Sequence, residues 1–166
     1  LLLWLALSSA AMADPASLGE RGRLILSDDF ADANNWVAEI EAKPGSTVST
    51  QNGRLVIDTA GGVTVWLKRR LSGNLLIEYR RRVVVEGGAN DRLSDLNQFW
   101  MATGPDGTSP LGRNGAFESY DALSLYYFGI GGNSNTSSRL RRYGDGQRVL
   151  LQERLGAGHL LQPNHD

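Results

Sequence analysis

Two neighbouring strand-like segments of the sequence combine tyrosines and arginines at spacings that suit a sugar-binding surface. In the first, Tyr127 alternates with Tyr126 in the two-residue period of a β-strand, so both faces carry a large side chain. In the second, Arg139, Arg141 and Tyr143 share one face. Aromatic rings cover the apolar faces of pyranoses, and guanidinium groups bind hydroxyls and carboxylates. An apolar core does not accept that many unpaired arginines, so the side chains lie either in a polar groove or on an outer, convex face.

Amide, tryptophan and arginine side chains on other strand-like segments can complete such a surface. Amides and guanidinium groups offer hydrogen bonds to hydroxyls, and a tryptophan ring offers a stacking plane. The residues that we expect to bind a saccharide are Arg80, Gln98, Trp100, Arg139, Arg141 and Tyr143, with Tyr126 beside them.

Carboxylates could supply acid–base chemistry to the same surface. A glycosidase needs two of them, about 5 to 9 Å apart across a cleft. The candidates are Glu78, Glu118, Asp95, Asp121 and Asp145. Glu78 has the most suggestive setting, because it shares a predicted strand face with Arg80. The alternative is that Glu78 forms a structural ion pair.

The sequence offers little for metal or nucleophile chemistry. The only histidines, His159 and His165, accompany no serine or cysteine nucleophile motif and no zinc-binding motif, which argues against serine and zinc chemistry. A polar loop before residue 96 contains Asp91 and Asp95, which could hold a structural calcium ion. The alternative is a solvated loop built on Asx turns, because the regular spacing of a calcium loop is absent.

The composition bounds the class of protein. The chain has 166 residues, a net charge of −1 and no cysteine, which allows one domain that depends on its core rather than on disulfides. The chain therefore has no net positive charge that would attract nucleic acid. Of the seventeen basic residues, fifteen are arginines. Arginine binds carboxylates in two places at once, so this bias is compatible with an acidic partner, although the codon bias of a GC-rich genome produces it too.

The first residues are typical of a secretory leader. An apolar run occupies residues 1–7, and small residues follow up to an A-x-A cleavage site at 11–13. The run is too short to span a bilayer, which takes about 20 apolar residues. We therefore predict a partial signal peptide at 1–13 and a secreted or periplasmic bacterial protein with no membrane span in the mature chain.

Short strands separated by glycine and asparagine turns dominate the rest of the chain. The predicted strands cover 23–26, 36–40, 47–51, 54–57, 63–67, 75–85, 97–103, 123–130, 139–143 and 149–154. The Asn52-Gly53 pair predicts a tight hairpin. No long helical period occurs, so we predict an all-β, antiparallel sandwich or jelly roll. Residues 14–166 form one such domain, and the final Pro163-Asn164 turn predicts that the sheet is incomplete at its C-terminal end.

The sequence resembles a family of secreted bacterial domains of unknown function with a concanavalin A-like lectin/glucanase jelly roll. The resemblance spans about 28–164 and is carried mostly by 90–103 (NDRLSDLNQFWMAT) and 112–143 (GRNGAFESYDALSLYYFGIGGNSNTSSRLRRY). It implies a jelly roll from polysaccharide-utilisation systems. It implies no established catalytic residue.

A fainter similarity links the chain to jelly-roll alginate lyases, whose motifs are R-x-E-x-R, Q-I-H and Y-F-K-A-G. The matching runs are 78–80 (EYR), 98–100 (QFW) and 127–131 (YFGIG), in the same order. Leu76, Trp100 and Gly129 stand where those motifs have arginine, histidine and lysine. Without the histidine, Tyr126 or Tyr127 would serve as the base, and Arg80 or Arg141 would neutralise the uronate carboxylate.

Three functions follow, each with its own expectation. The first is an exported jelly roll that recognises poly- or oligosaccharides, acidic ones above all, in polysaccharide breakdown. The second is a polysaccharide lyase or glycoside hydrolase whose catalytic residues are Tyr126, Tyr127 or Glu78. The third is a structural sandwich, which predicts that Arg139 and Arg141 are paired with acids on a convex face.

Overall fold

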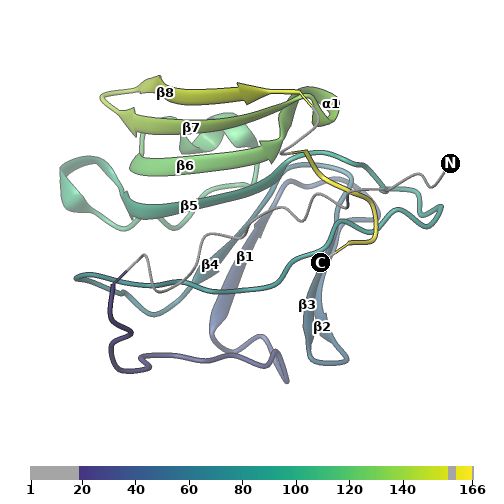
Figure 1. The fold of residues 1–166 in the computed structure, drawn as a ribbon, viewed down its shortest axis with the longest axis horizontal. Coiled ribbons are helices and arrows are strands. Elements are labelled where there is room, and N and C mark those ends of the chain that lie inside the picture. Colours follow the sequence, from purple (N-terminus) through teal and green to yellow (C-terminus); the bar gives the residue numbers. More distant parts are fainter. Residues whose placement is uncertain (1–18, 157–159, 166) are drawn as a thin grey trace, which may run out of the picture.

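The computed structural model describes residues 19–156 and 160–165, and nearly all regular structure in them is antiparallel β-sheet (Figure 1). This confirms the predicted all-β class. The strands are β1 (Trp36–Ile40), β2 (Thr47–Gln51), β3 (Arg54–Asp58), β4 (Val63–Leu67), β5 (Leu96–Thr103), β6 (Ser124–Gly131), β7 (Ser137–Gly144) and β8 (Gln147–Leu155). The helical elements are the 3₁₀ turns η2 (Pro105–Gly107) and η3 (Phe117–Tyr120) and the short α1 (Gly132–Asn135). None of the described helices is long and apolar enough to cross a membrane.

The described strands form three sheets. β5, β6, β7 and β8 lie side by side in that order, β1 pairs with β4, and β2 pairs with β3. The β2–β3 connection is the predicted Asn52-Gly53 turn, with both residues at positive φ (50° and 68°). That conformation matches the right-handed twist of the strands that it joins. In Figure 1 the four-stranded sheet lies at the top, and the two smaller sheets run beneath it.

The core lies under β6, where the four-stranded sheet meets β4 and the segment around η3. Leu123, Leu125, Tyr127, Tyr143 and Tyr120 are its buried side chains. From the β1–β4 sheet, Trp66 contributes an edge-to-face contact with Phe99 of β5, at 5.0 Å between ring centroids. Aromatic packing therefore joins two sheets that share no strand pairing among the described residues.

Two strands of the large sheet carry an irregularity in their pairing. In β5 the pairing with β6 shifts between Trp100 and Thr103, and Met101 there has a positive φ of 57°. In β8 the pairing with β7 shifts between Leu150 and Gln152, so that Leu151 has no opposite residue. A β-bulge of this kind changes which face the following side chains occupy.

Two predicted strands are missing from the described residues. The prediction of strands at 23–26 and 75–85 was wrong, since the structure has no strand in either range and only an isolated parallel bridge between Val83 and Pro163. A strand needs a partner for its backbone groups, and no other described segment pairs along these two. The predicted signal peptide at 1–13 lies outside the described residues.

Candidate functional site

The register of β6 and β7 assigns their side chains to two faces of the sheet. Tyr127 lies opposite Arg141, and Tyr126 lies opposite Arg142. Directly opposed residues point to the same face, so Tyr126 and Arg141 point to opposite ones. The expectation that Tyr126 shares a surface with Arg139 and Arg141 was therefore wrong.

The first face carries five side chains that we call the Tyr–Arg face. They are Tyr127, Arg139, Arg141, Tyr143 and Arg148. The two tyrosine rings form its floor, with centroids 5.9 Å apart, and both tyrosines are buried. The Arg141 guanidinium lies over the Tyr127 ring, 5.7 Å from its centroid. The floor therefore offers π-faces to the cationic groups above it.

Arg148 is fixed in place by the segment around η3. Its Nε donates a 2.6 Å hydrogen bond to the carboxylate of Asp121, and the two residues form an ion pair. Its guanidinium also lies 4.2 Å from the ring centroid of Phe117 and 5.6 Å from that of Tyr143. Sequence reasoning missed Arg148, because only the pairing of β8 with β7 places it opposite Tyr143 on this face.

Arg139 is paired as well. It forms an ion pair with Glu153 across the β7–β8 ladder. With its amide oxygen turned toward Arg139, Asn133 accepts two further hydrogen bonds of 2.7 and 2.9 Å from the guanidinium. The side chains of the ion pair are only 27% and 30% exposed. Glu153 and Asn133 thus hold Arg139 against the sheet.

Arg141 differs from its neighbours, because no carboxylate of the described residues forms an ion pair with it. Its guanidinium contacts the ring of Tyr127 and lies beside the hydroxyl of Tyr143. Arg139 and Arg148 already have Glu153 and Asp121 as partners. The described face therefore presents one uncompensated, half-buried guanidinium between two compensated ones, an arrangement that can accept a carboxylate.

The tyrosines of this face remain protonated at neutral pH. Burial raises the pKa of Tyr127, electrostatic interactions with Tyr143 and Asp95 add to the rise, and the charges of Arg141 and Arg148 oppose it. Burial also raises the pKa of Tyr143, against Arg148 and Arg141. Both hydroxyls are thus hydrogen-bond donors rather than bases under ordinary conditions.

The hydroxyl of Tyr143 is buried and makes no hydrogen bond of normal geometry in the described residues, although Arg141 lies close to it. A buried donor without a good partner costs stability. We expect Tyr143→Phe to raise the free energy of unfolding by about 1 kcal/mol. Tyr126→Phe, on the half-exposed opposite face, is the matched control and should change it little. Urea denaturation of both variants measures the effect, and destabilisation by Tyr143→Phe would show that the hydroxyl has a partner.

The opposite face of the sheet holds the other predicted saccharide contacts. Trp100 and Tyr126 stack there with ring centroids 6.4 Å apart and an angle of 17° between planes. Gln98 belongs to the same face, one row further along. Beside them lies a shallow groove of about 300 Å³, lined by Phe128, Ile130, Ser138, Leu140, Gln152 and Arg154. The predicted site residues are thus divided between two faces of one sheet.

Glu78 and Arg80 lie outside both groups. Glu78 forms an exposed 2.6 Å ion pair with Arg21, in line with the structural alternative for this residue. Arg80 is exposed and forms no ion pair with an acidic side chain of the described residues. Of the two histidines, His165 is exposed and His159 lies outside the described residues.

The polar loop before β5 is organised by Asp91. One oxygen of its carboxylate accepts hydrogen bonds from the backbone amides of Glu86, Gly87 and Gly88, and these bonds lower the pKa of Asp91. Asp95 contacts Arg92 and Ser94 instead. Nowhere in the described chain do three or more histidine, cysteine or acidic side chains gather as a metal site. The calcium site stays a prediction.

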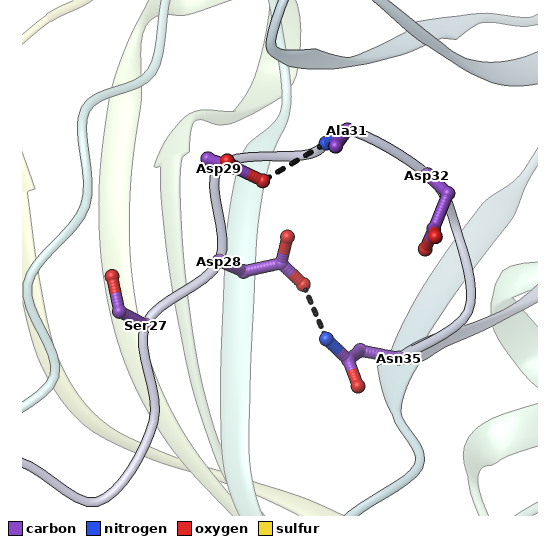
Figure 2. Close-up of a pocket in the computed structure, with 6 residues that line it drawn as sticks. All are labelled: Ser27, Asp28, Asp29, Ala31, Asp32 and Asn35. Atoms are coloured by element: carbon purple, nitrogen blue, oxygen red, sulfur yellow. Dashed lines mark hydrogen bonds between the residues drawn. The ribbon is translucent and has the colours of Figure 1, made fainter.

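A second turn built on aspartates follows Ser27 (Figure 2). Asp28 accepts a hydrogen bond from the side chain of Asn35, which Figure 2 shows, and also from the amide of Phe30 and the indole of Trp36. The hydrogen bond from Asn35 contributes most to the lowered pKa of Asp28. The hollow of about 350 Å³ between these side chains is lined by Ser27, Asp28, Asp29, Ala31, Asp32 and Asn35. Its carboxylates are already used in turns.

Glu39 is a structural carboxylate that sequence reasoning missed. It is buried and accepts hydrogen bonds from the amides of Gly112 (2.6 Å) and Arg113 (2.9 Å). The indole of Trp66 (2.9 Å) and the hydroxyl of Tyr120 (2.8 Å) donate two more. Burial and the nearby carboxylate raise the pKa of Tyr120 to about 12. Glu39 thereby anchors the 104–120 loop, which leads directly to the η3 segment that contacts Arg148.

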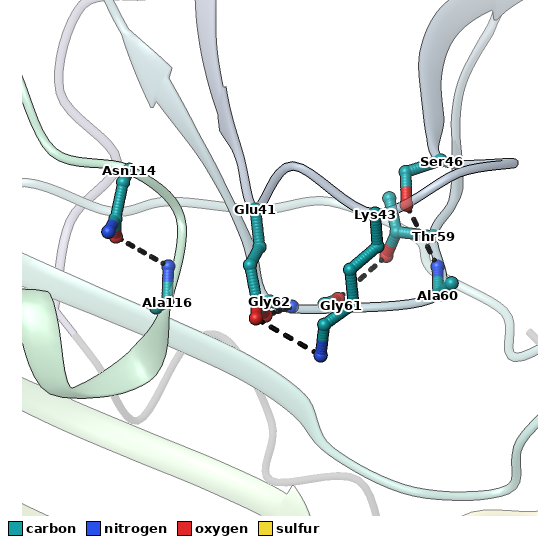
Figure 3. A network of polar contacts seen from close by, with 9 residues as sticks. All are labelled: Glu41, Lys43, Ser46, Thr59, Ala60, Gly61, Gly62, Asn114 and Ala116. Carbon is teal, nitrogen blue, oxygen red and sulfur yellow. Dashed lines mark hydrogen bonds and ion pairs between the residues drawn. The ribbon is translucent and has the colours of Figure 1, made fainter.

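A polar network continues this anchorage beyond the end of β1 (Figure 3). The amide of Gly62 donates a 2.8 Å hydrogen bond to Glu41, whose carboxylate also pairs with Lys43. Asn114 lies nearby in the loop, where it accepts a hydrogen bond from the amide of Ala116. The loop backbone between them approaches Gly62 so closely that a Cβ there would lie 2.3 Å from the carbonyl oxygen of Gly115.

Comparison with known proteins gives one match. The family described as a domain of unknown function, DUF6250, matches residues 57–166, which include β4 to β8 and therefore the whole Tyr–Arg face. No curated protein and no solved structure matches the chain.

Proposed function

The chain belongs to the DUF6250 family of domains of unknown function, and from that premise we propose that it binds acidic polysaccharides through the Tyr–Arg face. In this proposal residues 14–166 form one concanavalin A-like jelly roll, exported behind a signal peptide at 1–13. It works outside the cytoplasm in the breakdown of uronate-containing glycans.

The guanidinium of Arg141, which has no carboxylate partner among the described residues, carries the proposal. A partly buried cation without a counter-ion is costly, and a carboxylate from a ligand would compensate it. Arg139 and Arg148 already pair with Glu153 and Asp121, so they can add hydrogen bonds without leaving a bare charge. Uronates supply both the carboxylate and the hydroxyl acceptors that such a surface needs.

Two alternatives are weaker on specific grounds. A lyase that used Tyr127 as its base would need the phenolate, and burial raises the pKa of that group. A structural sandwich accounts for the ion pairs of Arg139 and Arg148, yet it gives no reason for an uncompensated Arg141. Recognition of an acidic ligand accounts for all three arginines.

The test compares Arg141→Gln with Arg142→Gln in affinity gels and calorimetry. We expect Arg141→Gln to weaken binding to polygalacturonate or alginate about tenfold or more, since hydrogen bonds to charged groups contribute about 1.5–3 kcal/mol. Arg142 is the matched control, because it neighbours Arg141 in sequence but is exposed on the other face.

Comparison of acidic with neutral glycans, and of the two variants with the wild type, tests whether the Tyr–Arg face is the binding site. Binding of the wild type should fall with salt and should be absent for a neutral glucan. Equal losses in both variants would point to general charge attraction rather than to this face. Binding of no acidic glycan by the wild type would overturn the proposal.

A further inference from the structure

Residues 75–85 have the pattern of a β-strand but no partner strand among the described residues. Apolar, largely β-branched or leucine residues occupy both of its ends (75–77 and 83–85), and charged residues with Tyr79 occupy its middle. Several of the large side chains are exposed, among them Leu76 (49%), Ile77 (61%) and Tyr79 (52%). In Figure 1 the segment between β4 and β5 runs as a plain tube below the large sheet. An exposed segment with this pattern is a template for strand addition.

One edge of this segment is already occupied at its C-terminal end. The amide of Asn164 donates to the carbonyl of Val83 (2.8 Å). The side chain of Asn164 accepts from the amide of Val85 (2.9 Å) and donates to the carbonyl of Val85 (3.0 Å). In a strand, odd- and even-numbered residues present their backbone groups to opposite edges. The edge of the even-numbered residues, from Leu76 to Val84, makes no backbone hydrogen bond in the described chain.

The segment is complementary to itself when reversed about Arg80. In that antiparallel register the apolar residues meet one another, the acid meets a base, and the tyrosine meets an arginine. The opposed pairs are Leu75 with Val85, Leu76 with Val84, Ile77 with Val83, Glu78 with Arg82, and Tyr79 with Arg81. Registers displaced by two residues are poorer, because they oppose Arg80 to Arg82 or Leu76 to Arg82.

We propose that residues 75–85 pair with the same residues of a second copy of this chain, antiparallel and about a two-fold axis at Arg80. The even-numbered residues form the hydrogen-bonded pairs, because theirs is the free edge, and they supply about ten backbone hydrogen bonds. Tyr79 and Arg81 then form a non-hydrogen-bonded pair, in which side chains lie closest. The two already make a cation–π contact at 5.4 Å within one chain.

Few interactions oppose this dimerisation, and their contributions to the free energy are small. On dimerisation Glu78 must give up its ion pair with Arg21 and form one with Arg82 of the second copy. The side chains of Arg21 and Glu78 are 62% and 54% exposed. Exposed ion pairs of this kind contribute little. The two copies of Arg80 meet at the axis, where like charges repel. The interface therefore has one unfavourable pair, at a known position.

Charge reversal at the Glu78–Arg82 pair tests the inference on the full chain by analytical ultracentrifugation. The wild type should sediment as a dimer. Glu78→Arg alone and Arg82→Glu alone should each weaken dimerisation about tenfold or more, because each puts two like-charged pairs in the interface. An equimolar mixture of the two variants should form a heterodimer, since both pairs are then of opposite charge. The Arg80→Gln variant should dimerise more tightly than the wild type, because it removes the repulsion between the two copies of Arg80.

Each other outcome counts against the inference. A monomeric wild type would mean that another segment covers this edge, or that it stays bare. Dimerisation of both single variants like the wild type would place the interface elsewhere. Variants that fail to associate on mixing would show that the pairing is not reciprocal. Glycan binding by a monomer would leave the proposed function intact, so the two proposals fail separately.

Discussion

Glu39→Gln should lower the free energy of unfolding by about 3 kcal/mol, because it breaks a buried charged network. The carboxylate accepts from Gly112, Arg113, Trp66 and Tyr120. An amide of the same size keeps one acceptor oxygen and turns two N–H groups toward the remaining donors. Guanidinium chloride denaturation measures the loss. Glu118→Gln, exposed in the same loop region, is the control and should change stability by less than about 0.5 kcal/mol.

The pH dependence gives a second measurement of the same interaction. Burial by itself raises the pKa of Glu39, but the hydrogen bonds from Arg113, Trp66, Tyr120 and Gly112 outweigh it and lower the pKa below the ordinary 4.5. A lowered folded-state pKa means that the stabilisation is complete above 4.5 and is lost as the pH falls through the lower value. The wild type should therefore lose stability in that range, and Glu39→Gln should lose less. Parallel pH profiles would contradict this account.

Gly115→Ala should destabilise the protein by about 3 kcal/mol or more. Gly115 has a φ of +86°, and a Cβ there would lie 2.4 Å from the amide nitrogen of Glu41 and 2.6 Å from the carbonyl carbon of Ile40. Backbone atoms cannot move aside as a flexible side chain can. The loop would have to lift away from the end of β1, which would loosen Phe117 and Asp121 at the Tyr–Arg face.

Gly112→Ala separates the two causes. Gly112 has a similar φ of +95°, but apart from its two chain neighbours no described residue has an atom within 4 Å of the position that a Cβ would take there. Its alanine variant should therefore lose only the conformational preference, about 1–2 kcal/mol. Denaturation of the two variants side by side gives the steric contribution as their difference. Equal losses would show that close approach of the loop to β1 has no effect on stability.

Local signals predicted most of the strands. Asn52-Gly53 identified the β2–β3 hairpin because the turn conformation depends on those two residues alone. Alternation along β6 and β7 was equally readable. The apolar and β-branched residues at 75–85 predicted a strand that the structure does not form, because a strand also requires a partner and no other described segment of the chain supplies one. The jelly-roll topology, which depends on such pairings, stays a prediction.

The candidate site was predictable in its residue types but not in its grouping. Arg139, Arg141 and Tyr143 were expected on one face and lie on one face. Tyr127 rather than Tyr126 joins them, since a shift of one residue in register exchanges the faces. Glu39 gave no signal at all, because the amides that it binds come from a loop more than seventy residues away along the chain.

Leu151, the extra residue in β8, determines which charged side chains of that strand lie on the same face. Arg148 and Glu153 are separated by an odd number of positions, so in an unbroken strand they would point to opposite sides. Leu151 restores their parity, and both then meet β7 partners on the Tyr–Arg face. Deletion of one residue at this bulge would remove no charged residue from the sequence. It would still break one of the two ion pairs, because Arg148 and Glu153 could no longer both lie on the Tyr–Arg face. Among related chains, binding specificity should therefore follow single-residue length changes in β8 as closely as it follows substitutions.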